Sequence, residues 1–130
     1  MEIIGEYVRT HLGTIGKVIG FDTDIESYVT DNFKVFDEVA VYKHSKNIID
    51  LIEDEDIVIL EYKSPKYRER ITRRFEVSKI DNDISFENAH CNFRCKIGDK
   101  KIKDNICKNI KIKSVVAKEQ FKNIEYIVEE

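Results

Sequence analysis

Four of the six arginines in the chain lie in one short stretch, between Tyr62 and Phe75. The guanidinium group of arginine offers a planar fork of hydrogen-bond donors that suits phosphate oxygens. Tyr67 and Phe75 lie beside these arginines in the sequence, and aromatic rings of this kind can stack on nucleobases. Arginine and aromatic residues in this combination indicate a site for a phosphate-bearing ligand.

Alternate residues of a β-strand share one face, so we expect Arg68, Arg70 and Arg74 on one face and Arg73 on the other. Three guanidinium groups on one face repel each other unless an anion or a carboxylate partner lies among them. Two alternatives to a phosphate ligand stay open: pairing with acidic residues of the first half of the chain, and contact with an acidic protein surface. The ligand-binding residues that we predict, with Asn92 added to read a base edge, are Tyr67, Arg68, Arg70, Arg74, Phe75 and Asn92.

Charge is distributed unevenly along the chain. Residues 1–60 contain 13 acidic and 5 basic residues, whereas residues 61–130 contain 12 acidic and 17 basic ones. A basic second half indicates an anionic partner, although attraction between the two halves explains the same asymmetry. Seven lysines between residues 96 and 113 could form a lid over an anion, or could simply keep a surface loop solvated. The net charge of −3 and the pI of about 5.7 disfavour non-specific DNA binding.

Metal binding and catalysis find little support in the sequence. Cys91 and Cys95 would share one face of a strand, but with Cys107 alone they lack the second ligand pair of a structural zinc site. We therefore expect ordinary thiols, no metal and no cofactor. The three histidines are far apart in sequence, and no P-loop, nucleophile elbow or H-E-x-x-H motif occurs. We expect a binding protein and not an enzyme.

The elements that position these residues are predicted to be mainly β. Runs of β-forming residues, several of them with alternating apolar and polar positions, are separated by short turns and predict ten strands: 6–10, 15–19, 25–30, 33–42, 57–62 (a central one), 70–80, 84–86, 91–95, 110–116 and 126–128. A short helix at 46–52 and a helical turn at 118–122 complete the pattern, and Gly13 is expected to turn the first hairpin. The fold class that we predict is a small antiparallel β-barrel, or two.

The 130 residues fit one compact domain, with a subdivision near residue 55 as an alternative: an SH3-like part at 1–55 and a basic β-rich part at 56–130. No apolar run approaches the ~20 residues that cross a membrane, and the first residues lack the pattern of a signal peptide. An odd number of cysteines also agrees with a cytoplasmic location. Exposed edge strands favour a homo-oligomer.

Two resemblances add to this interpretation. The first covers Gly5-Glu6-Tyr7-Val8-Arg9-Thr10 and Gly13-Thr14-Ile15-Gly16-Lys17-Val18, which resemble the start of SH3-like barrels of the KOW type. The resemblance implies that a hairpin presents its loop to RNA or protein.

The second resemblance is to a family of small, largely uncharacterised proteins of phages and prophages of clostridia and their relatives. It covers three blocks in the same order: Glu6 to Thr10, Lys43 to Glu53 and Ile112 to Phe121. The middle of the chain, residues 57–108, is the most variable part of that family. The resemblance implies a phage setting and places any particular function in this middle part.

Small phage proteins include inhibitors of host defence, and this setting leads to the function that we expect. The leading expectation is a counter-defence sponge, a non-catalytic protein that sequesters a cyclic nucleotide or a cyclic ADP-ribose type of immune signal in the host cytoplasm. The first alternative is an anti-CRISPR-type inhibitor that binds a host effector protein. The second is an accessory barrel that binds RNA or DNA.

Overall fold

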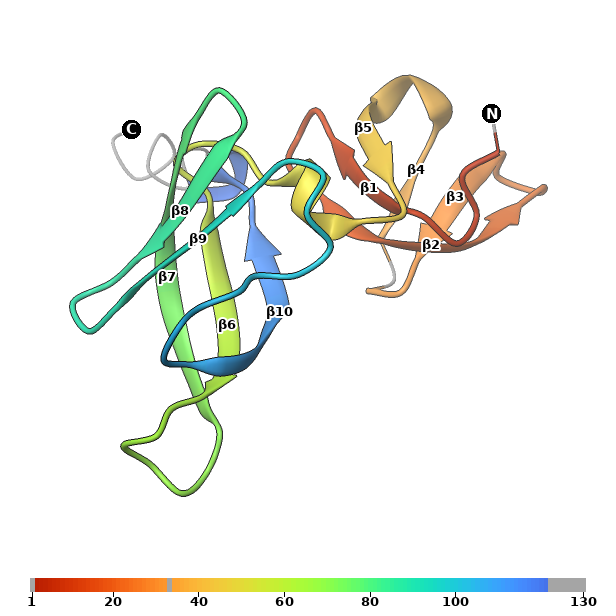
Figure 1. Cartoon of the computed structure of the whole chain (residues 1–130). Coiled ribbons are helices and arrows are strands. Elements are labelled where there is room, and N and C mark those ends of the chain that lie inside the picture. The colour runs from red at the N-terminus through yellow and green to blue at the C-terminus, as the bar shows by residue number, and fades with distance from the viewer. Residues whose placement is uncertain (1, 33, 122–130) are drawn as a thin grey trace, which may run out of the picture. The chain divides into compact units, whose positions relative to one another are not determined.

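The computed structural model describes residues 2–32 and 34–121, which fold into two compact units (Figure 1). Unit 1 comprises the described residues up to Leu51 together with 119–121, and unit 2 comprises Ile52–Lys118. The boundary at Leu51 lies close to the subdivision expected near residue 55. Each unit contains one five-stranded antiparallel sheet, so the mainly β fold class that the sequence predicts is confirmed.

Unit 1 is a strand meander whose last strand returns to pair with the first. In sheet order β4-β3-β2-β1-β5, its strands are β4 (Val35–Phe36), β3 (Ser27–Thr30), β2 (Ile15–Asp22), β1 (Tyr7–Thr10) and β5 (Val41–Ser45). A register shift between Val18 and Gly20 bends β2, so that its two halves pair with different neighbours. Unit 1 is therefore a five-stranded antiparallel sheet, and its SH3-like character stays a prediction. Its core consists of Ile3, Val8, Val18, Tyr28 and Phe36.

Gly13 turns the hairpin between β1 and β2, as the sequence predicts. Its φ of +89° lies in the left-handed region, which glycine adopts without steric cost. The Thr10 amide donates to the Thr14 carbonyl at 2.9 Å, and the Gly13 amide donates to the Thr10 carbonyl at 3.0 Å. These bonds fix the register in which Val8 lies opposite Gly16.

Two predictions for unit 1 were wrong in detail. Residues 34–42 do not form one continuous strand, because a 3₁₀ turn, η1 (Glu38–Ala40), separates β4 from β5. The amide of Ala40 closes this turn on the carbonyl of Asp37 at 3.1 Å. The predicted helix at 46–52 is the 3₁₀ segment η2 (Ile48–Leu51), and the Ser45 hydroxyl accepts the Asn47 amide just before it at 3.0 Å. Its apolar residues are too dense for one helical face, and both Ile49 and Leu51 are buried.

Unit 2 carries the longer sheet. In sheet order β10-β6-β7-β8-β9, its strands are β10 (Lys108–Val116), β6 (Ile57–Lys63), β7 (Ile71–Ile80), β8 (Asp83–Glu87) and β9 (Asn92–Lys96). The expected central position of β6 is confirmed, because it pairs with both β10 and β7. The sheet is curled, and the segment around Ile102 makes one bridge to each edge strand, Lys103 to Arg94 and Ile102 to Ile110 (Figure 1).

An aromatic cluster fills the interior of this curled sheet. The rings of Tyr62, Phe75 and Phe93 lie with their centroids 5.1–6.0 Å apart, two pairs of them edge-to-face. Buried aliphatic residues of β6, such as Val58 and Leu60, extend the same core. The even residues of β6 and the odd residues of β7 therefore point inward, and the residues that alternate with them along each strand point outward.

Past β10 the chain enters a helical turn at 118–121, within the predicted turn at 118–122. The strand predicted at 126–128 and residue 33 lie outside the described residues. None of the helices in the described part of the chain is long and apolar enough to cross a membrane.

Candidate anion-binding site

Arg70, which was predicted to bind phosphate, forms hydrogen bonds with its neighbours in unit 2. Its Nε donates to Glu61 Oε1 at 2.5 Å, and its Nη2 donates to the Asn109 carbonyl at 2.5 Å. The hydrogen bond from Arg70 lowers the pKa of the Glu61 carboxyl below its ordinary value, and the charge of Lys113, whose Nζ lies 3.6 Å from Glu61 Oε2, acts in the same direction. Arg70 therefore pairs with a carboxylate of the adjacent strand, and not with the acidic first half of the chain.

Tyr67 and Arg68 lie in the loop between β6 and β7, and both are exposed. The Lys63 ammonium closes this loop from one side by donating to the carbonyl oxygens of Tyr67, at 3.0 Å, and of Arg68. The loop backbone is thus held, while the two side chains remain at the surface.

Phe75 was expected to stack on a ligand, and its position disagrees with that role. The residue is fully buried, and its ring packs against those of Tyr62 and Phe93. It occupies an inward position of β7 together with Val77, whereas Arg74, the residue before it, points outward. No face of the Phe75 ring is available to a ligand.

The alternation expected for the arginines of β7 is observed. Arg74 is exposed on the outer side, where it lines a hollow of about 440 Å³ with Glu76, Glu87, Asn88 and Ala89. Arg73 lies on the inner side opposite Leu60 and is half-buried. The charge of Arg73 lies close enough to the Tyr62 hydroxyl to oppose the rise in pKa that burial causes there.

A second group of cations lies on the outer side of β9 and in the segment that follows it. The register places Ser78 opposite Ser85, Ser85 opposite Arg94, and Arg94 opposite Lys103. These four residues form one row across the sheet, which we call the outer row. Buried neighbours on both sides, Phe93 and Cys95, force the Arg94 side chain outward.

Asn92, the predicted reader of a base edge, lies next to the outer row. Its Nδ2 donates to Glu87 Oε1 at 3.1 Å, and its Oδ1 accepts the Ser85 hydroxyl at 3.1 Å. Asn92 and Arg74 thus both lie on the outer side of the sheet, but Arg68 and Tyr67 belong to the β6–β7 loop. The structure does not gather the six predicted residues into one site.

Two neighbouring hollows flank the outer row and share Arg94 and Asp99. The lysine hollow, of about 460 Å³, is lined by Arg94, Asp99, Lys100, Lys101 and Lys103. The serine hollow, of about 700 Å³, is lined by Ser78, Ile80, Asp83, Ile84, Ser85, Glu87, Arg94, Cys95, Lys96 and Asp99. Four cations and one carboxylate therefore surround the smaller hollow, and hydroxyls, carboxylates and an exposed isoleucine surround the larger one.

Local backbone structure positions the lysine hollow. Asp99 Oδ2 accepts the Lys96 amide at 2.8 Å and the Asp99 amide donates to the Lys96 carbonyl at 3.0 Å, so that this tight turn ends β9. Ile102 is buried and bridged to Ile110, so that Lys101 and Lys103 on either side of it point outward. The lysines are exposed, and no carboxylate of the described residues pairs with the guanidinium of Arg94.

Arg94 and its row were missed at the level of sequence. The signals that could have found them are the apolar residues on either side of Arg94 and the lysines between 96 and 113, which indicated added positive charge. The pairing of Lys103 with Arg94 depends on the course of the loop after β9, and no local pattern reveals that course.

The cysteines form no metal centre in the described part of the chain, where no group of three histidine, cysteine or acidic side chains could hold an ion. All three thiols are free. Cys91 Sγ lies 3.5 Å from the Tyr62 hydroxyl. Burial, with a smaller effect of Asp99, raises the pKa of the Cys95 thiol to about 12, so this thiol is a poor nucleophile.

Comparison with models of known protein families finds no match to this chain, and comparisons with curated proteins and with solved structures find none either.

Proposed function

We propose that this protein binds, without catalysis, a nucleotide-sized ligand that carries phosphate, and that the outer row of unit 2 holds it. The observation that carries the proposal is the position of Arg94, which lines both hollows and has four outward cations around it, Lys96, Lys100, Lys101 and Lys103. Guanidinium and ammonium groups that converge on an open hollow favour a phosphate group.

The serine hollow suits the remainder of such a ligand. Asp83 and Glu87 can accept hydrogen bonds from ribose hydroxyls or from the amino group of a base, and Ile80 offers an apolar surface. The lysine hollow next to it would then hold the phosphates, with Arg94 contacting both parts. A ligand of nucleotide size would span the two hollows, because Arg94 and Asp99 belong to both.

The biological role that we propose for this binding is sequestration of a nucleotide-derived immune signal in the host cytoplasm. Support for the phage setting comes from the three sequence blocks that resemble small phage proteins. Support for the ligand class comes from the outer row alone. The site that we propose therefore differs from the one expected at the arginines of the β6–β7 loop. It lies at the β8–β9 hairpin and the segment after it, within the middle part of the chain, residues 57–108.

Isothermal titration calorimetry against cyclic nucleotides, cyclic dinucleotides and cyclic ADP-ribose isomers tests the proposal. A charge-assisted hydrogen bond contributes about 1.5–3 kcal/mol, so Arg94→Gln should weaken binding by roughly tenfold to 150-fold. Arg68→Gln is the matched control, since it removes an exposed arginine of the same unit that lines neither hollow. Circular dichroism would verify that both variants fold.

Three results would contradict the proposal. The first is that no compound of the panel binds at millimolar concentration. The second is that Arg68→Gln weakens binding more than Arg94→Gln, which returns the site to the loop. The third is that single-stranded RNA binds and competes with every nucleotide, with a steep dependence on salt, which favours a nucleic-acid-binding barrel.

A further inference from the structure

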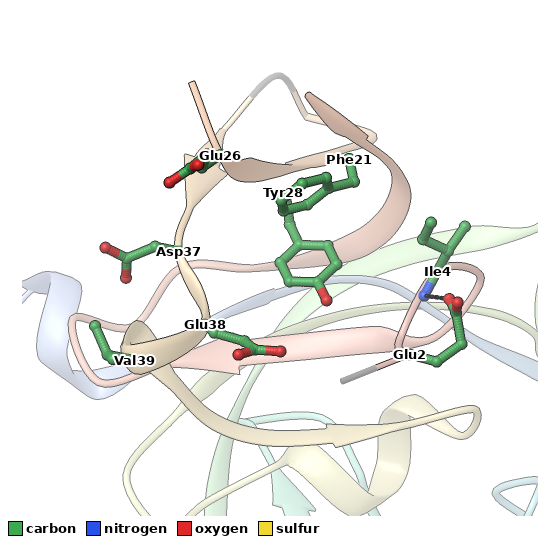
Figure 2. A pocket seen from close by; sticks show the side chains of 8 residues that line it. All are labelled: Glu2, Ile4, Phe21, Glu26, Tyr28, Asp37, Glu38 and Val39. Atoms are coloured by element: carbon green, nitrogen blue, oxygen red, sulfur yellow. Dashed lines mark hydrogen bonds between the residues drawn. The ribbon is translucent and has the colours of Figure 1, made fainter. Parts of the chain in front are cut away.

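Unit 1 contains a pocket with an acidic lining, in contrast to the lysine hollow of unit 2. It has a volume of about 550 Å³ and is lined by Glu2, Ile4, Phe21, Glu26, Tyr28, Asp37, Glu38 and Val39 (Figure 2). Four of these eight residues are carboxylates and none is basic. The segment before β1, the strands β2 and β3 with the turn between them, and η1 with the residue before it supply them.

Stacked aromatic rings form one wall of this pocket. Tyr28 packs edge-to-face on Phe21 at 5.0 Å between centroids and stacks on Phe36 at 5.5 Å. The Tyr28 ring is buried in the core of unit 1, while Figure 2 shows its hydroxyl directed toward the side on which Glu38 and Glu2 lie. Burial, and after it the charges of Glu38 and Glu2, raises the pKa of this hydroxyl, which agrees with a negative potential at the pocket.

Apolar side chains at the rim are unusually exposed. Val39 on η1 is 84% exposed, Ile4 is 50% exposed and Phe21 is 45% exposed. Large apolar groups that surround a hollow in this way are typical of a surface that a partner covers. The carboxylates among them favour a partner that carries positive charge.

A metal ion does not fit this pocket. An ion needs several oxygen ligands at about 2–2.6 Å, and no three acidic side chains of the described residues come close enough together to hold one. The carboxylates are instead spread around the hollow, with Glu26 and Asp37 on the side opposite Ile4 and Glu2 (Figure 2). Such a spread suits an extended ligand with more than one cationic group.

We infer that this pocket binds a short basic segment of a partner protein, in which lysine or arginine alternates with aliphatic residues. The aliphatic side chains would contact Ile4, Phe21 and Val39, and the cationic side chains would reach the surrounding carboxylates. The inference is independent of the nucleotide proposal, because it concerns the other unit and a ligand of opposite charge.

An NMR titration of the ¹⁵N-labelled full chain tests the inference. The probe is the capped peptide leucine-arginine-leucine-lysine-leucine, and the control peptide carries citrulline and acetyl-lysine in place of the two cations. The expected result is a saturable shift of the backbone amides of Phe21, Tyr28 and Val39 with the basic peptide alone. Cyclic nucleotides should leave these three amides unmoved, which separates this inference from the nucleotide proposal.

Variants locate the contact. Exposed ion pairs are weak, so Glu38→Gln should raise the dissociation constant by about two- to fivefold. Val39→Ala should raise it by up to about tenfold, because it removes apolar contact without touching the core. Asp24→Asn is the matched control, since Asp24 is an exposed carboxylate of unit 1 that does not line the pocket.

Each other outcome overturns the inference. Absence of shifts at millimolar peptide removes the site. Equal binding of the neutral peptide shows that charge plays no part. Equal loss on Asp24→Asn shows a diffuse electrostatic attraction, and shifts of the same amides that depend on protein concentration without peptide show that a second copy of the chain occupies the pocket.

Discussion

A buried ion pair ties the end of the described chain to the first strand of unit 1, and its removal gives a sharp test of the structure. Arg9 on β1 is fully buried, and its Nη2 lies 2.9 Å from Glu119 Oε2, while its Nη1 donates to the Leu51 carbonyl at 3.0 Å. The Glu119 side chain keeps 30% of its surface exposed. Water can therefore solvate Glu119 when Arg9 is removed, but it reaches the buried Arg9 guanidinium poorly when Glu119 is removed.

The two single substitutions are expected to have unequal effects. Glu119→Gln removes the charge of the carboxylate that lies 2.9 Å from the buried guanidinium, and breaking a buried pair costs up to about 3–5 kcal/mol. Because Glu119 is partly exposed and the Leu51 carbonyl remains, we expect about 2–3 kcal/mol here. Arg9→Met removes the buried charge itself, leaves Glu119 to water, and should cost about 1–2 kcal/mol for the lost hydrogen bond to Leu51.

A double-mutant cycle measures the interaction directly. Urea unfolding of the wild type, the two single variants and the double variant should give a coupling energy of about 2 kcal/mol between Arg9 and Glu119. The matched control is the cycle on Lys96 and Asp83, whose 4.0 Å pair is largely exposed and should couple by less than about 0.5 kcal/mol. Unfolding of two units need not be a single transition, so each cycle compares the same transition.

Two results would contradict this expectation: Arg9→Met proves more destabilising than Glu119→Gln, or the coupling energy falls to that of the exposed control pair. Either result would mean that the guanidinium is solvated in solution, and that residues 119–121 do not hold the described end of the chain to β1.

Two further predictions follow from shifted pKa values. The pKa of Glu61 is lowered in the folded state, so its pair with Arg70 stabilises the protein at pH values above the ordinary carboxyl pKa of about 4.5, and this stabilisation is lost as the pH falls through the folded pKa. The urea midpoint should therefore fall less between pH 6 and pH 3.5 in Glu61→Gln than in the wild type. An equal fall in both proteins would show that the pair does not stabilise the fold. The Cys95 thiol is buried and its pKa is raised to about 12, so it should resist iodoacetamide at pH 8, while the half-buried Cys91 reacts first. Peptide mass spectrometry would measure the order of labelling. Preferential labelling of Cys95 would show that β9 opens in solution.

Much of the fold could be predicted because its strands are short runs of β-forming residues between turns. Residues 57–60 are a continuous apolar run, and Ile71, Phe75 and Val77 share one face of 70–80; both segments became strands within one residue of the predicted limits. The reversal after Phe36 was missed because no glycine or proline marks it. A backbone hydrogen bond between Asp37 and Ala40 makes that turn inside a run of residues with high β propensity.

The structure separates the predicted site residues for a different reason. Closeness in sequence suggested that Arg70 and Phe75 act together, but Arg70 lies beside Glu61, and Phe75 belongs to the core. Sequence patterns show which side of a strand a residue occupies, but they do not show which strand lies next to it. Glu61 and Arg70 meet because β6 and β7 pair, and this pairing supplies the carboxylate partner that three neighbouring arginines were expected to need.

The pairing register of β8 with β9 determines which residues make up the outer row. A slip of one residue between β8 and β9 would turn Arg94 inward and bring Phe93 to the surface, because side chains alternate with a period of two. Burial of Phe93 against Tyr62 and Phe75 opposes that slip. The same aromatic contacts that stabilise the interior of unit 2 therefore keep Arg94 at the two hollows. A substitution that loosens the core at Phe93 should weaken the anion binding that we propose, even though Phe93 lines neither hollow.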